Sequence, residues 1–131
     1  MTLLVEPKSV QHGARAAIRR GKVHHYNDAE KVGYQNHIIL ESKHHAPRIP
    51  FKEPLVVEYL FLLPRAKSNE DIFPHRIKPD VLNLAKHTED ALTKAGFWVD
   101  DKQVIDMSIR KRFVEPGLPP RIEITIKTVT P

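Results

Sequence analysis

The chain has 131 residues, the size of one domain, and its lack of cysteine excludes disulfides, zinc ribbons and cysteine nucleophiles. Lysine and arginine number 21 against 16 acidic residues, and the resulting net charge of +5 suits a polyanionic partner without fixing the fold. No apolar run is long enough to span a membrane, so we expect a single cytoplasmic domain over residues 1–131.

Short strands and one helix are predicted in the first half of the chain. Proline residues and an Asn-Asp pair at 27–28 mark where these elements end and begin. In order, we expect a short strand at 2–5, a loop or long hairpin at 11–21, a returning strand at 23–26, and a helix at 29–43 capped by Asn27 or Asp28.

The middle of the chain gives the clearest signals. Residues 55–63 are apolar apart from Glu58 and lie between two prolines, which predicts a central strand. The polar, proline-rich residues 65–79 predict a surface loop. A helix should follow from Asp80, a good N-cap after Pro79, to about Ala95.

The apolar spacing of this helix predicts one buried face, and Gly96 is the natural capping residue just after its C-terminal end. Two strands, at 104–114 and 121–129, complete the chain. This order of elements predicts an α+β fold in which two main helices pack on one mixed sheet. The predicted buried face comprises Val81, Leu84, Ala85, Thr88, Ala91, Leu92 and Ala95.

Charge is distributed unevenly along the sequence. Residues 80–101 hold five acidic side chains against two lysines, whereas the flanking segments are basic. Carboxylates that bind a divalent metal between cations that bind phosphate would suit an enzyme acting on nucleic acid. Solvated surface charge is the alternative. The eight histidines show no metal-ligand spacing such as HExxH.

The acidic residues lie at both ends of the predicted helix. Asp80 begins it, and Asp100 and Asp101 follow its other end, about 24 Å away. They can meet only if the chain doubles back. The simpler interpretations are that Asp80 caps the helix and that Asp100 and Asp101 form a turn.

Two stretches around this helix resemble the RusA-like endodeoxyribonucleases, a family of Holliday junction resolvases. The first runs Lys78-Pro79-Asp80-Val81-Leu82-Asn83-Leu84-Ala85-Lys86. The second runs from Asp90-Ala91-Leu92-Thr93-Lys94-Ala95-Gly96-Phe97-Trp98-Val99 to Asp100-Asp101-Lys102-Gln103-Val104. Apart from Leu82, they match the specific family pattern D-x-D-N-L-x-K and D-A-L-x-x-A-G-x-W-x-D-D-x-Q-V, and the N-terminal region matches the family more loosely.

The resemblance implies a homodimeric nuclease that uses Mg²⁺ or Mn²⁺ to cleave four-way DNA junctions. It places Asp80 and Asp101 at the metal site, gives Lys86 a catalytic role, and implies the doubling-back that brings the two aspartates together. Basic residues are the expected phosphate contacts. These are Lys8, Arg15, Arg19, Arg20, Lys22, Arg76 and Lys78, with residues 110–112 as further candidates.

One position departs from the family pattern. Leu82 stands where the pattern has a third aspartate, so an alkyl group replaces an anionic oxygen ligand. We therefore expect impaired cleavage, unless Asp90, Asp100 or Asp106 supplies the missing carboxylate. The alternative is a protein that binds branched DNA without cleaving it.

Overall fold

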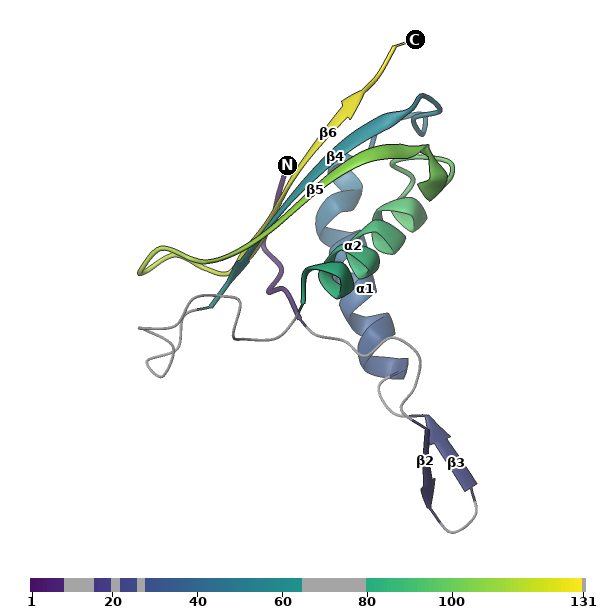
Figure 1. The fold of residues 1–131 in the computed structure, drawn as a ribbon, viewed down its shortest axis with the longest axis vertical. Helices are drawn as coiled ribbons and strands as arrows, with labels where there is room; N and C mark the ends of the chain where they lie inside the picture. The colour runs from purple at the N-terminus through teal and green to yellow at the C-terminus, as the bar shows by residue number, and fades with distance from the viewer. Residues whose placement is uncertain (9–15, 20–21, 26–27, 65–79, 131) are drawn as a thin grey trace.

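A four-stranded sheet with two helices on one of its faces makes up most of the molecule (Figure 1). The computed structural model describes residues 1–8, 16–19, 22–25, 28–64 and 80–130, with the backbone alone for those of residues 16–28. None of the described helices has the length and apolar composition needed to span a membrane.

Strand β4 (Leu55–Leu63) is central to the sheet. It pairs with β5 (Val104–Phe113) in parallel and with β6 (Arg121–Thr128) antiparallel. The short β1 (Thr2–Leu3) extends the other side of β6, so the strand order is β1-β6-β4-β5. Alternate residues of β4 point to the helices, and the side chains of Val57, Tyr59 and Phe61 are fully or almost fully buried in the core.

The two helices are α1 (Asp28–Ser42) and α2 (Val81–Ala95), which pack against each other on the covered face. A short 3₁₀ turn, η1 (Lys43–His45), follows α1, and a second, η4 (Asp101–Gln103), precedes β5. Because β4 and β5 are parallel, the chain must cross back between them, and α2 makes this crossing. Helix α2 therefore runs opposite to β5.

The predicted fold class is confirmed, and most element boundaries lie within two residues of those expected. The predicted hairpin is present as β2 (Ala16–Arg19) and β3 (Lys22–His25), which form a separate two-stranded sheet. Residues 65–79, where we predicted a surface loop, lie outside the described residues.

Candidate active site

The N-terminal end of α2 presents three of the residues singled out by the sequence. Asp80 is the N-cap, and its Oδ1 accepts a hydrogen bond of 2.9 Å from the backbone N–H of Asn83. Leu82 is 73% exposed, and Lys86, one turn further along, is also exposed. The predicted cap is therefore present, and the cap bond occupies one carboxylate oxygen while the side chain stays open to solvent.

The opposite face of α2 is buried, as its spacing predicted. Leu84, Ala85, Thr88, Ala91 and Leu92 lie in the core, and Val81 and Ala95 lie at its margin. His87 is also fully buried, which the apolar pattern did not predict. The buried face stabilises the helix, and the exposed face that carries Leu82 and Lys86 is accessible to a ligand.

After α2, the backbone of residues 97–99 is hydrogen-bonded to Phe51, in the segment before β4. Gly96 adopts a left-handed conformation with φ 91°, which ends the helix. The backbone N–H of Phe51 donates to the carbonyl of Phe97 at 2.9 Å, and that of Val99 donates to the carbonyl of Phe51 at 3.3 Å. The buried indole of Trp98 donates to the Thr93 hydroxyl at 2.7 Å.

Gln103 fixes the turn that contains the two aspartates. Its side-chain oxygen accepts hydrogen bonds from the backbone N–H groups of Val99 and Asp100, and its amide donates to the carbonyls of Phe51 and Glu53. Asp100 caps the turn as the first residue of a capping box that Gln103 completes. This role of Gln103 was not predicted, although the D-x-x-Q spacing from Asp100 could have revealed it.

Four carboxylates form an acidic cluster at this end of α2, namely Glu89, Asp90, Asp100 and Asp101. Partial burial and the charges of Asp101 and Asp90 raise the pKa of Glu89 to about 7. Hydrogen bonding to Asp100 is the main cause that raises the pKa of Asp101, and the charges of Asp100 and Asp90 add to it. The backbone N–H of Lys102 lowers the pKa of Asp100. The cluster therefore holds excess negative charge that a cation would relieve.

Tyr59 on β4 lies close to Glu89 and Asp90 of the acidic cluster. The Tyr59 hydroxyl is buried and has no hydrogen-bond partner among the described residues. Burial, and then the charges of Glu89 and Asp90, raise its pKa above the usual range. Tyr59 therefore stays protonated within the core. Its position in an apolar strand gave no sign of this in the sequence.

Asp80 and Asp101 lie at opposite ends of α2 in the structure. The chain does reverse direction along β5, but Asp101 precedes that strand and remains at the far end of the helix. Asp101 lies close enough to Glu89, in the second half of α2, to raise its pKa, and no hydrogen bond or ion pair among the described residues joins Asp101 to Asp80. No group of three or more histidine or acidic side chains within the described residues could hold a metal ion. One chain therefore does not fit the metal site that the resemblance implies.

The predicted DNA contacts are only partly described. Lys8 is exposed, and its backbone N–H donates to the Tyr34 hydroxyl at 3.3 Å. Arg19 and Lys22 face each other in the β2–β3 hairpin, with their side chains undescribed. Arg15, Arg20, Arg76 and Lys78 lie outside the described residues.

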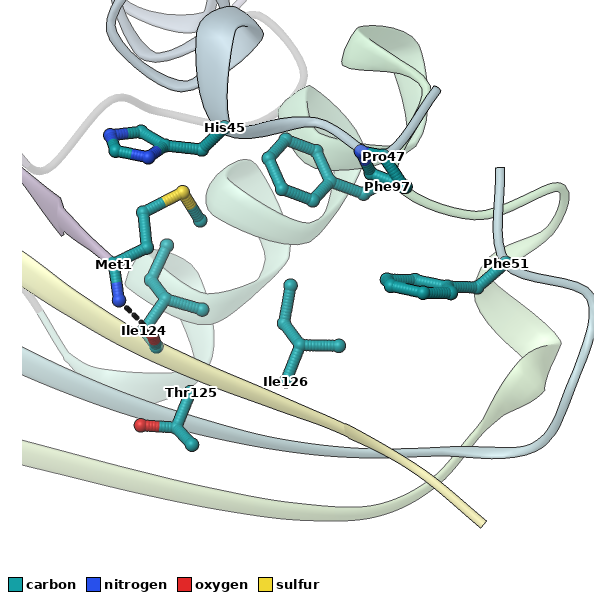
Figure 2. Close-up of a pocket in the computed structure, with 8 residues that line it drawn as sticks. All are labelled: Met1, His45, Pro47, Phe51, Phe97, Ile124, Thr125 and Ile126. Atoms are coloured by element: carbon teal, nitrogen blue, oxygen red, sulfur yellow. Dashed lines mark hydrogen bonds between the residues drawn. The ribbon is translucent and has the colours of Figure 1, made fainter. Parts of the chain in front are cut away.

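A pocket of about 420 Å³ lies on the helix-covered face of the sheet, beside β6 and away from β5 (Figure 2). The N-terminal amine of Met1 lies there and donates to the carbonyl of Ile124 at 2.9 Å. Among the described residues that line it, His45 alone has a titratable side chain. The other lining residues are Pro47, Phe51, Phe97, Thr125 and Ile126. The described lining of the pocket contains no carboxylate.

The fold and these side chains define an α+β domain in which the exposed Asp80 begins the crossing helix, the exposed Lys86 lies on it, and the exposed Asp101 lies in the turn that follows it. The sequence matches the family described as endodeoxyribonuclease RusA over residues 6–127, so the chain belongs to this family. The resemblance seen in the sequence is thereby confirmed.

Individual relatives divide into two kinds. The uncharacterized protein YqaN of Bacillus subtilis (strain 168) is 29% identical over 140 residues, which cover 98% of this chain and 95% of that protein. The crossover junction endodeoxyribonucleases RusA of Enterobacteria phage 82 and Escherichia coli (strain K12) are each 51% identical over 53 residues. That stretch covers 40% of this chain and 42% of those relatives.

Proposed function

We propose that this chain is a divalent-metal-dependent endodeoxyribonuclease that resolves four-way DNA junctions during recombination and repair. The family match over residues 6–127 is the observation that carries this proposal. Mg²⁺ or Mn²⁺, bound by Asp80 and Asp101, is the cofactor, branched DNA is the substrate, and the cytoplasm of a bacterial or phage-infected cell is the place of action.

The chain's own side chains suit a phosphodiester substrate. Lys86 places an exposed ammonium group midway between the two ends of α2, where it can bind a phosphate oxygen and stabilise developing negative charge. Asp80 stays oriented by its cap bond to Asn83. Since the donors of one chain do not converge, we assign no catalytic step to the metal within a single copy.

Leu82 favours a second candidate, a branched-DNA-binding protein with deficient cleavage. Its side chain is 73% exposed, so it contributes little to packing while it lacks the oxygen ligand of the family pattern. Phosphate contacts by basic residues do not depend on that ligand. Binding can therefore persist where cleavage is weak.

The two candidates are separated by comparing this chain with Leu82→Asp on a labelled four-way junction with Mg²⁺ or Mn²⁺. We expect Leu82→Asp to cleave roughly 10- to 100-fold faster, because a small misplacement of reacting groups costs about that much. Equal rates would refute the impairment by Leu82. A gel shift in EDTA completes the test, since binding without cleavage by either protein would favour the DNA-binding candidate.

A further inference from the structure

The pocket beside β6 has the size and the walls of a ligand site. Its volume of about 420 Å³ lies within the range of roughly 300–1,000 Å³ that is typical of small-molecule pockets. The Phe51 ring and the Met1 thioether reach into it from opposite sides, and the Phe97 ring and Ile126 lie between them (Figure 2). Aromatic rings and thioethers make favourable contacts with planar aromatic groups. The walls therefore suit a flat aromatic ligand.

Part of the apolar wall remains open to solvent. Met1, Phe51 and Ile126 pack against the core and are only partly buried, whereas Phe97 is 3% exposed and belongs to the core itself. A ligand that covers the three partly buried side chains would remove more of their apolar area from water. Removal of apolar area from water favours binding.

The main chain holds the Phe51 wall in place. The backbone N–H of Phe51 donates to the carbonyl of Phe97 at 2.9 Å, and the carbonyl of Phe51 accepts a bond of 2.8 Å from the Gln103 amide. A wall that is fixed before the ligand arrives loses little conformational entropy on binding. Because these bonds involve the backbone of Phe51, a change of its side chain leaves them available.

The segment along one side of the pocket is basic. Residues 42–52 contribute His45, Pro47 and Phe51 to the lining. They include three exposed cationic side chains and no acidic one. Cations spread along a segment suit successive phosphates of a nucleic acid strand better than one isolated phosphate. These cations are Lys43, Arg48 and Lys52.

His45 adds a polar group to the lining. Its side chain is exposed, and a neutral imidazole offers one donor and one acceptor nitrogen. The His44 ring lies beside it, with 4.1 Å between the ring centroids. A base that stacks on apolar walls still needs partners for the polar atoms at its edge, and His45 can supply one of them.

We propose that this pocket holds one unpaired nucleotide of a DNA strand, with its base against Phe51 and Phe97 and its phosphates along residues 42–52. A base offers both faces to a protein only when it is not stacked within a duplex. The choice of DNA as the strand rests on the proposed function. Binding in the pocket does not, because it needs neither the two aspartates nor cleavage.

Fluorescence anisotropy of a labelled oligothymidylate, in EDTA to prevent cleavage, tests the pocket. Phe51→Ala should weaken binding by about tenfold, because it removes a stacking wall. Leu60→Ala is the matched control, since Leu60 is a half-buried apolar residue on the uncovered face of β4, and it should leave binding unchanged. Equal affinities of Phe51→Ala and the unmutated protein would overturn the proposal.

A second variant blocks the pocket and retains the Phe51 wall. The indole of Ile126→Trp is larger than the half-buried side chain that it replaces and would occupy the space of the base. We expect a similar loss of about tenfold in affinity, with circular dichroism to verify that the variant is folded. Undiminished binding by folded Ile126→Trp would contradict a base in the pocket.

A photoreactive base locates the contact in the unmutated protein. An oligothymidylate that carries one 5-iododeoxyuridine is irradiated with the protein, and the cross-linked peptide is identified by mass spectrometry. We expect cross-links at residues 45–51 or at Phe97. Cross-links confined to other parts of the chain would place the base elsewhere and refute the assignment.

Competitors define the ligand. Unlabelled oligothymidylate should displace the labelled strand at least tenfold better than a duplex of equal length or thymidine monophosphate. Equal displacement by the duplex would exclude recognition of an unpaired base, and equal displacement by the mononucleotide would exclude a role for the basic segment. Tighter binding of an oligouridylate would overturn DNA as the strand.

The pocket and the nuclease can fail separately. Weaker strand binding by Phe51→Ala, together with cross-links at the pocket and no cleavage of any junction, would support the pocket and contradict the nuclease. Junction cleavage with cross-links away from the pocket would support the nuclease and contradict the pocket.

Discussion

Replacing Glu89 by glutamine should stabilise the protein at alkaline pH. Partial burial and the nearby charges of Asp101 and Asp90 raise the pKa of Glu89 from 4.5 to about 7. Between these two values, the folded protein retains a proton that the unfolded chain has lost. The free energy of unfolding therefore falls as pH rises through this interval, and the full cost of the carboxylate is present above pH 7.

The size of the effect follows from the pKa change. The interval from 4.5 to about 7 sets an upper limit of about 3 kcal/mol, at about 1.4 kcal/mol for each pH unit. Glu89 is only partly buried, and water screens its charge, so we expect about 1 kcal/mol. Glutamine is neutral in both states and removes this cost.

Urea unfolding at pH 8, 6 and 4.5 measures the difference between the unmutated protein and Glu89→Gln. The variant should be more stable by about 1 kcal/mol at pH 8, and the difference should disappear towards pH 4.5. Glu58→Gln, at an exposed position on the opposite face of the sheet, is the matched control and should show no such trend. A difference that is absent at pH 8, or that grows on acidification, would refute the electrostatic description of the cluster.

Substitutions at three positions, Asp80, Gln103 and Gly96, test the two ends of α2. Asp80→Asn keeps an oxygen for the N-cap bond and should change the free energy of unfolding by less than about 0.5 kcal/mol, whereas Asp80→Ala should lower it by about 1 kcal/mol; equal stabilities in urea would contradict the cap. Gln103→Ala removes four hydrogen bonds and should lower the free energy of unfolding by about 2–3 kcal/mol. Lys102→Ala, in the same turn, is the control and should be nearly neutral. A similarly small loss for Gln103→Ala would show that other contacts hold the turn. Gly96→Ala forces a side chain into a left-handed conformation and should cost about 1–2 kcal/mol. A methyl group added at Gly33 on α1 would meet no atom within 4 Å, so Gly33→Ala should instead raise the free energy of unfolding by up to about 1 kcal/mol. Thermal unfolding in which Gly96→Ala is more stable than Gly33→Ala would contradict the left-handed conformation of Gly96.

The secondary structure could be predicted because its signals are local. Two prolines enclose β4, Asp80 follows Pro79, and Gly96 follows the last apolar position of α2, so each boundary is determined by residues next to it. The hairpin of β2 and β3 was also predictable from its turn. That it forms a sheet of its own was not, because pairing with the main sheet depends on distant residues.

The arrangement of the candidate site depends on such distant contacts. The sequence places Asp101 after the helix, but where the chain turns is decided by the hydrogen bonds from residues 97–103 to Phe51 and Glu53, about fifty positions earlier. Local spacing was compatible with either a return towards Asp80 or a turn at the far end.

The residues of α2 that stabilise the fold are distinct from those on its exposed face, and this explains how Leu82 can occur in an intact fold. The buried face holds the helix to the sheet, whereas Leu82 is 73% exposed and replaces a residue that the fold does not need for packing. Loss of a metal ligand there would leave the strand order, the helix cap and the acidic cluster unchanged. The fold therefore depends on the buried residues, whereas the proposed cleavage depends on exposed residues, and a comparison of Leu82 with aspartate evaluates it.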